Sequence, residues 1–152
     1  MIGTEEIYPL AVEFRRYFHQ HPEFAMQEVE TQRYIAEVLE QNGIPYQKVG
    51  TGLIATVGKG EKCIAIRADM DALKVKEETG LSYCSQNEGM MHACGHDMHM
   101  AMVLGASGRG SFITSRTFKR TRSASYIRTT RFPEPSDRNY RNSSRGLFRL
   151  FR

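Results

Sequence analysis

Residues 92 to 99 concentrate side chains that bind metal ions, because the run His-Ala-Cys-Gly-His-Asp-Met-His holds a thiol, several imidazoles and a carboxylate. Only Gly95 separates Cys94 from His96, so an extended or turning backbone can direct both side chains to one ion. Thiolate and imidazole are ligands of zinc and related divalent ions. The alternative is a surface loop whose histidines have no ligand role. The density of ligating groups favours a metal site.

Two carboxylates follow an apolar segment earlier in the chain. Cys63 to Ile66 is an apolar run typical of a strand that is covered on both faces and lies inside a sheet. Asp69 and Asp71 come directly after it, where open α/β sheets hold their ligands, and strand alternation would direct both to one side. They are equally well explained as turn-forming aspartates at the end of a strand.

Two helices are expected before this strand. Apolar residues at helical spacing from Ile7 to Phe18 predict an amphipathic helix, which ends near Pro22 because proline cannot donate a backbone hydrogen bond. His19 and His21 could be ligands, but beside a helix end positioning or capping is the more frequent role. A second helix is predicted from about 27 to 42, with Gly43 as its stop signal.

The pattern then changes to short strands and a loop. Residues 45–49 and 53–57 are rich in β-forming residues on either side of a glycine-containing turn, and a third strand is predicted over 62–68. Residues 74–91 have no regular period and are expected to deliver the chain to the metal loop. Asp97 is placed as the N-cap of a helix that ends near Ala106.

Charge divides the chain into two parts. Residues 1–106 contain nine Lys and Arg against fifteen Asp and Glu, whereas residues 107–152 contain twelve against two. The three cysteines are an odd number without scaffold-like spacing, which fits a reducing cytoplasm better than a disulfide framework. No signal pattern or membrane-length apolar run is found. A cytoplasmic location without a membrane partner is therefore expected.

Five segments, taken together, resemble consecutive motifs of the M20 metallopeptidase family. The likeness is greatest to amidohydrolases that cleave N-acyl amino acids, hippurate-like compounds and auxin conjugates. Lys74 stands where that family usually has proline, and Met100 where threonine is common. The segments are Phe18-His19-Gln20-His21-Pro22-Glu23, Gly50-Thr51-Gly52, Arg67-Ala68-Asp69-Met70-Asp71-Ala72-Leu73, Glu77-Glu78-Thr79-Gly80-Leu81 and the run from His92 to His99.

The resemblance implies an α/β fold, a truncated three-layer α/β/α sandwich of the zinc-exopeptidase type, with residues 1–106 as the N-terminal part of the catalytic domain. It implies two divalent metal ions, zinc or manganese, with Cys94 as a shared ligand and His96 as a ligand of one ion. Asp69 would be the carboxylate that orients an imidazole. The substrate would be a small N-acyl amino acid, and the full-length enzyme a homodimer or larger oligomer.

The general base implied by the resemblance is absent from this chain. The family supplies it from a Glu-Glu pair soon after the helix that begins at Asp97, whereas the only acidic residues after 106 are Glu134 and Asp137. The last histidine is His99, so further ligands are missing as well. Two ligands fall short of the four that a closed zinc site uses. We therefore expect an inactive fragment that binds metal weakly.

Residues 107–152 allow two interpretations. Eleven arginines, one lysine and no sustained helical or strand period, starting where the family likeness ends, favour out-of-frame translation that yields a disordered basic tail. The alternative is a basic arm that binds nucleic acid without enzymatic activity. In that case arginines would neutralise phosphates, and interleaved aromatic residues such as Tyr126 and Phe132 would stack on bases.

Overall fold

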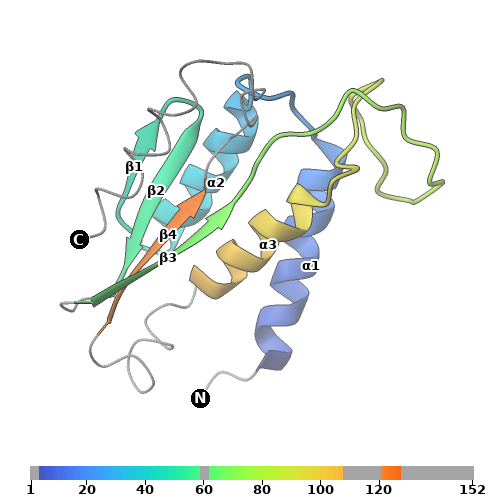
Figure 1. Ribbon diagram of the computed structural model, residues 1–152. Helices are drawn as coiled ribbons and strands as arrows, with labels where there is room; N and C mark the ends of the chain where they lie inside the picture. Colours follow the sequence, from blue (N-terminus) through green and yellow to red (C-terminus); the bar gives the residue numbers. More distant parts are fainter. Residues whose placement is uncertain (1–3, 59–61, 108–120, 128–152) are drawn as a thin grey trace.

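A computed structural model of the chain describes residues 4–58, 62–107 and 121–127 (Figure 1). Within these ranges no helix combines the length and apolar character needed to cross a membrane. In chain order the elements are α1 (Thr4–Gln20), α2 (Val29–Gln41), β1 (Tyr46–Val49), β2 (Gly52–Val57), β3 (Lys62–Ala68), α3 (His96–Ser107) and β4 (Thr121–Ile127).

The described strands form one mixed sheet in the order β1-β2-β4-β3. β1 pairs antiparallel with β2, and β2 pairs antiparallel with β4. β3 and β4 run parallel, with Lys62 opposite Thr121 and Ala68 opposite Ile127. The carboxyl ends of β3 and β4 therefore lie at the same edge of the sheet.

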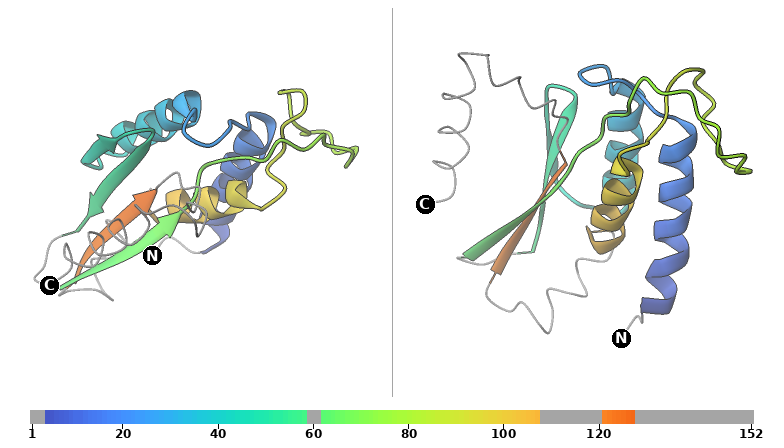
Figure 2. Two further views of the ribbon diagram at one scale, coloured as in Figure 1. Left: turned by 45° about the horizontal axis from the view of Figure 1, so that its top comes forward. Right: turned by 45° about the vertical axis from the view of Figure 1, so that its right-hand side comes forward.

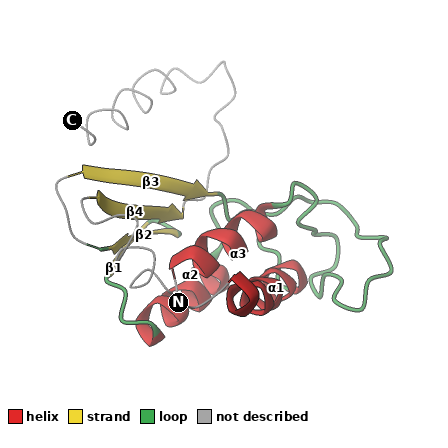
Figure 3. Cartoon of the chain, turned by 90° about the horizontal axis from the view of Figure 1, so that it is seen from below, coloured by secondary structure: helices red, strands yellow, loops and turns green. Residues whose placement is uncertain are grey.

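The helices of the described chain all lie on one side of this sheet (Figure 3). α1 runs alongside α3, as both views in Figure 2 show. The two helices approach closely at Gly105, where an added Cβ would lie 3.4 Å from Ile7 Cγ2 and 3.5 Å from Ala11 Cβ. The result is a mixed α/β fragment with one covered sheet face.

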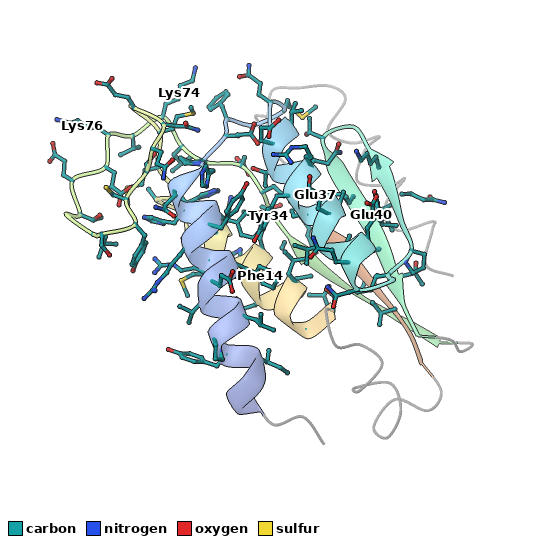
Figure 4. All side chains as sticks on the ribbon, turned by 180° about the vertical axis from the view of Figure 1, so that it is seen from behind. Phe14, Tyr34, Glu37, Glu40, Lys74 and Lys76 are labelled. Atoms are coloured by element: carbon teal, nitrogen blue, oxygen red, sulfur yellow. The ribbon has the colours of Figure 1, made fainter. Side chains whose placement is uncertain are left out.

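Apolar side chains from all three helices and the sheet form the core. The amphipathic pattern predicted for the first two helices is confirmed in part: Phe18, Ile35 and Leu39 are each no more than 1% exposed, whereas Val29, also expected in the apolar stripe, is 60% exposed. The same core contains Leu53, Met70, Met100 and Leu104. Aromatic rings join α1 to α2: Tyr17 stacks on Tyr34 with centroids 3.6 Å apart, and Phe14 meets the Tyr34 ring edge-on (Figure 4).

The end of α1 near Pro22 and the end of α2 before Gly43 agree with the sequence prediction. Gly43 has a φ of +64°, a conformation that suits glycine at a helix stop. At the start of α2, the Glu23 carboxylate accepts hydrogen bonds from the backbone N–H groups of Glu30 and Thr31. These bonds satisfy donors that the first turn of a helix leaves free.

Two predictions about the sheet were wrong. β3, expected inside the sheet and covered on both faces, is an edge strand of the described sheet, and Ile66 is 47% exposed. One face of β3 is uncovered because the described helices lie on one side of the sheet. β3 is at the edge because β4 pairs with β2 and lies between β2 and β3. β4 itself falls in a segment where no strand period was found. The rest of residues 107–152, and with it most of the proposed nucleic-acid arm, lies outside the described residues.

Candidate metal centre

A closed loop brings the end of β3 next to the residues that precede α3. The backbone N–H of Leu73 donates to the Met91 carbonyl at 3.0 Å, and the Met91 N–H donates back to the Leu73 carbonyl at 3.0 Å. This pair of bonds closes the irregular segment 74–90 at its base, and the segment projects from the sheet with Lys74 and Lys76 on it (Figure 4). The pairing of Leu73 with Met91 therefore brings the backbone near Asp71 close to the backbone near His92.

His96 is held from one side of its ring by Asp71. Its Nδ1 lies 2.9 Å from the Asp71 carbonyl oxygen and 3.1 Å from the carboxylate atom Oδ1. The contact with the Asp71 carboxylate is the largest cause that raises the pKa of His96, and burial opposes it. An Nδ1–H that donates to the carbonyl leaves the Nε2 lone pair available to a cation, which is the tautomer that metal-binding histidines adopt.

Cys94 precedes His96 across a tight turn. Gly95 adopts a φ of +82°, as its position between the two candidate ligands requires, and its N–H donates to the His92 carbonyl at 3.1 Å. The Cys94 thiol is free and exposed. α3 begins at His96, so Asp97 lies in the first turn and is not the N-cap. A thiol and an oriented imidazole at this turn fit part of a divalent-metal site.

The two aspartates after β3 have different partners. Asp69 accepts two hydrogen bonds from the Arg67 guanidinium, at 3.0 and 2.6 Å, whereas Asp71 provides the carboxylate beside the His96 ring. Strand alternation does not govern Asp71 because β3 ends at Ala68. The role predicted for Asp69, orienting an imidazole, stays a prediction, since the carboxylate next to the His96 imidazole belongs to Asp71.

A second network of charged groups holds Asp97, the residue after His96. The Asp97 Oδ2 atom lies 2.7 Å from His19 Nδ1 and 3.2 Å from Arg15 Nε. The other ring nitrogen of His19, Nε2, lies 3.1 Å from Glu77 Oε1. The side chains of His19, Asp97 and Glu77 are all at most 5% exposed. His19 thus pairs with two carboxylates, and the positioning role predicted for it stays a prediction. His21 caps α1, because its Nδ1 lies 2.7 Å from the Tyr17 carbonyl.

Three buried residues, His92, Glu28 and Asp71, have side-chain atoms without a hydrogen-bond partner among the described residues, and for Asp71 this is Oδ1, which meets His96 as an ion pair. Neither ring nitrogen of His92 has a hydrogen bond, and burial lowers the pKa of this histidine to about 4. One carboxylate oxygen of Glu28 accepts a hydrogen bond from Thr51 at 2.7 Å, while the other has no partner. Burial is the main cause that raises the pKa of Glu28, and the charge of Asp71 contributes in the same direction.

The sequence predicted that Cys94, His96 and the carboxylates after β3 belong to one site. It did not predict the contacts of three residues around that site. Asp71 was noted as a carboxylate but not as the partner of His96. Glu77 belongs to one of the recognised motifs, which was the available signal for it. Nothing in the sequence pattern indicated that Arg15 would pair with Asp97. Within the ranges that the structure describes, no three His, Cys, Asp or Glu side chains gather as a metal cluster.

Comparison with known proteins identifies relatives of most of the described region. Residues 65–108 match the family described as Peptidase family M20/M25/M40. The chain is 44% identical over 102 residues to N-acetyldiaminopimelate deacetylase of Halalkalibacterium halodurans, covering 64% of this chain and 28% of the relative. It is 46% identical over 97 residues to N-acetyl-L-cysteine deacetylase of Bacillus subtilis, covering 61% of this chain and 23% of the relative.

A solved structure extends the likeness to the fold. The crystal structure of a dinuclear metal-binding peptidase from the M20 family of Bacillus subtilis aligns with a TM-score of 0.75 and 34% identity, over 84% of this chain and 36% of that one. These matches support membership of the M20 peptidase family and show its α/β architecture. The chain spans about a quarter of the length of the curated relatives it matches.

Proposed function

From the M20 membership that the comparisons support, we propose that this chain is part of a dinuclear metal-dependent amidohydrolase. The substrate would be an N-acyl amino acid or a related conjugate, the class to which hippurate-like and auxin-conjugate substrates belong. Two relatives whose names are N-acetyldiaminopimelate deacetylase and N-acetyl-L-cysteine deacetylase support the acylated amino acid. The acyl bond cleaved would be an amide, and we place the protein in the cytoplasm.

Cys94 and His96 would hold the metal, with Cys94 shared between two ions of zinc or manganese. When bound, such ions polarise an amide carbonyl and lower the pKa of a bound water toward neutrality. The observation that carries the proposal is the position of His96, whose Nδ1 is 2.9 Å from the Asp71 carbonyl. That contact holds the ring through Nδ1 and leaves Nε2 as the nitrogen that would bind the metal.

The chain by itself would be inactive, because the Glu-Glu pair that the M20 resemblance implies as general base does not follow α3 in the sequence. β3 and β4 are parallel, so the chain leaves β4 at the same sheet edge as the one where Asp69 follows β3. The residues after Ile127 in the sequence are Arg-Thr-Thr-Arg, and none can act as a general base at neutral pH. Incomplete ligation by two side chains would also keep metal affinity low.

Cobalt(II) titration of the full chain tests the proposed ligands. We expect a thiolate-to-cobalt charge-transfer band that Cys94→Ser abolishes and Cys84→Ser retains, because Cys84 is also exposed and free but lies outside the turn. A band that survives Cys94→Ser would contradict the assignment. Incubation of the zinc-loaded or manganese-loaded chain with N-acetyl amino acids should release no amino acid, and turnover abolished by Cys94→Ser would overturn the inactivity.

A further inference from the structure

The side-chain contacts that link Asp97, His19 and Glu77 have no part in the proposed function. A carboxylate faces each ring nitrogen of His19, Asp97 Oδ2 at 2.7 Å and Glu77 Oε1 at 3.1 Å. The buried His19 ring therefore bridges two carboxylates that come from separate parts of the chain.

Each carboxylate is anchored on its far side. Asp97 accepts from Arg15 through Oδ2 and from the Met98 backbone N–H at 2.9 Å through Oδ1. Glu77 accepts from the Ser85 backbone N–H at 2.6 Å and from the Thr79 hydroxyl. Burial would raise the pKa of Glu77, but these bonds and the one from His19 hold its pKa below the usual value. Both carboxylates are thus held by further donors on the side away from His19.

The network joins three elements around the candidate ligands. Arg15 and His19 are on α1, Glu77 is on the loop after β3, and Asp97 is on the first turn of α3, one residue after His96. Asp71 holds the His96 ring from the β3 side. The turn that carries Cys94 and His96 is therefore fixed on two sides, by Asp71 through the ring and by His19 through Asp97.

We propose that His19 is a positioning residue for the metal site, which acts through Asp97 to fix the first turn of α3 and the Cys94–His96 turn before it. The proposal rests on the proposed function, because it concerns the same ligands. His19 lies 2.7 Å from Asp97 and is adjacent in sequence to neither ligand, so its effect on the site passes through the Asp97 contact. A residue that merely fills the core would have no specific effect on metal binding.

Substitutions at position 19 separate the two contacts. The amide nitrogen of Asn occupies a place close to Nδ1 and can still donate to Asp97, whereas the longer Gln reaches toward Glu77 in place of Nε2 and leaves Asp97. His21→Gln is the matched control, because His21 lies at the same helix end and, among the described residues, its ring bonds to the Tyr17 carbonyl of α1 and not to Asp97. Circular dichroism would first establish that each full-length variant is folded.

The decisive measurement is cobalt affinity, read from the charge-transfer band, in parallel with amide hydrogen exchange. His19→Gln should weaken cobalt binding by about tenfold or more, as loss of groups that orient metal ligands generally does. His19→Asn and His21→Gln should stay close to the original chain. Exchange in His19→Gln should accelerate in residues 94–100 and not in α2.

The outcomes distinguish this proposal from the proposed function. Equal cobalt affinity in His19→Gln and the original chain would overturn the positioning role, even if the variant melts earlier. Equal weakening by His19→Gln and His19→Asn would also overturn it, because the Asp97 contact would then be irrelevant. If the original chain shows no band that depends on Cys94, the proposed ligands are wrong, and the exchange comparison still decides whether His19 fixes the turn.

Discussion

His19 and His92 are buried to the same extent, each with 3% of its surface exposed, and their surroundings are opposite. Both ring nitrogens of His19 meet carboxylates, whereas neither ring nitrogen of His92 has a hydrogen bond among the described residues. Buried polar groups in folded proteins nearly always have partners. The α1 side of the candidate site is therefore complete within the described chain, while the side next to the β3 end has unmet hydrogen-bonding capacity.

The contrast indicates where this fragment is self-sufficient. The network around His19 draws all its donors and acceptors from residues 15 to 98. Glu28, like His92, has a buried atom without a partner. We expect the His19 network to stabilise the fold of this chain, and the groups near the β3 end to contribute little to its stability.

Replacing each histidine by phenylalanine tests that contrast most strongly. His19→Phe leaves the buried carboxylates of Glu77 and Asp97 without their shared partner, and should lower the free energy of unfolding by about 3 kcal/mol or more. His92→Phe removes two unsatisfied nitrogens and should change it by less than about 1 kcal/mol. Urea unfolding followed by circular dichroism measures both. Similar losses of unfolding free energy in the two variants would show that the hydrogen-bond partners of His19 do not make it more important for stability than His92.

Gly95 connects the two regions, and substituting it should have an intermediate effect. Its N–H donates to His92, and its carbonyl accepts from the Met98 and His99 N–H groups. Its φ of +82° disfavours a side chain although nothing lies within 4 Å of an added Cβ. Gly95→Ala should cost roughly 1 to 2 kcal/mol of unfolding free energy through backbone strain. Gly105→Ala is a suitable control because Gly105 is helical, and a larger loss there would contradict this explanation.

Glu28 should give the smallest effect, visible in the pH dependence of stability. Its pKa in the folded chain is raised above the ordinary 4.5, chiefly by burial, so the folded state binds more protons than the unfolded state over that interval. Stability therefore falls as the pH rises from about 4.5 through the folded-state pKa. Glu28→Gln should remove this fall. The Thr51 hydrogen bond opposes the shift and limits its size.

Thermal or urea unfolding between pH 4 and 8 would measure the Glu28 effect, with Glu40→Gln as a control on the exposed face of α2. Curves for Glu28→Gln and the original chain that run parallel across this range would show that Glu28 is ionised in the folded chain. That outcome would mean that burial does not disfavour the charged form of Glu28, and it would weaken the contrast between the His19 network and the groups near the β3 end.

Local features of the fold could be predicted from the sequence because they depend on neighbouring residues. The stop of α2 at Gly43, the capping role of His21 and the freedom of Gly95 all follow from chemistry within a few positions. The partner of His96 could not be predicted in the same way, because Asp71 is 25 residues away and is placed by the closure of the loop at Leu73 and Met91. The pairing of His19 with Asp97 spans 78 residues for the same reason.

The sheet shows a different limit of sequence reasoning. The apolar run before Arg67 predicted a strand correctly, but its position at the edge depends on what pairs with it. β4 lies in a segment whose side-chain pattern gave no strand signal, and it nevertheless pairs on both sides. Long-range pairing of this kind is determined by topology, which periodicity does not report.

The central place of β4 has a consequence for where this polypeptide could be shortened. Interstrand bonds are made by peptide groups, which every residue except proline supplies in full, so a segment of unremarkable composition can still bridge its neighbours. A version cut after Ser107 would leave β3 with no strand beside it and divide the described sheet into a hairpin and a lone ribbon. Residues 121–127 are therefore needed to connect β3 to the β1–β2 hairpin in the described sheet.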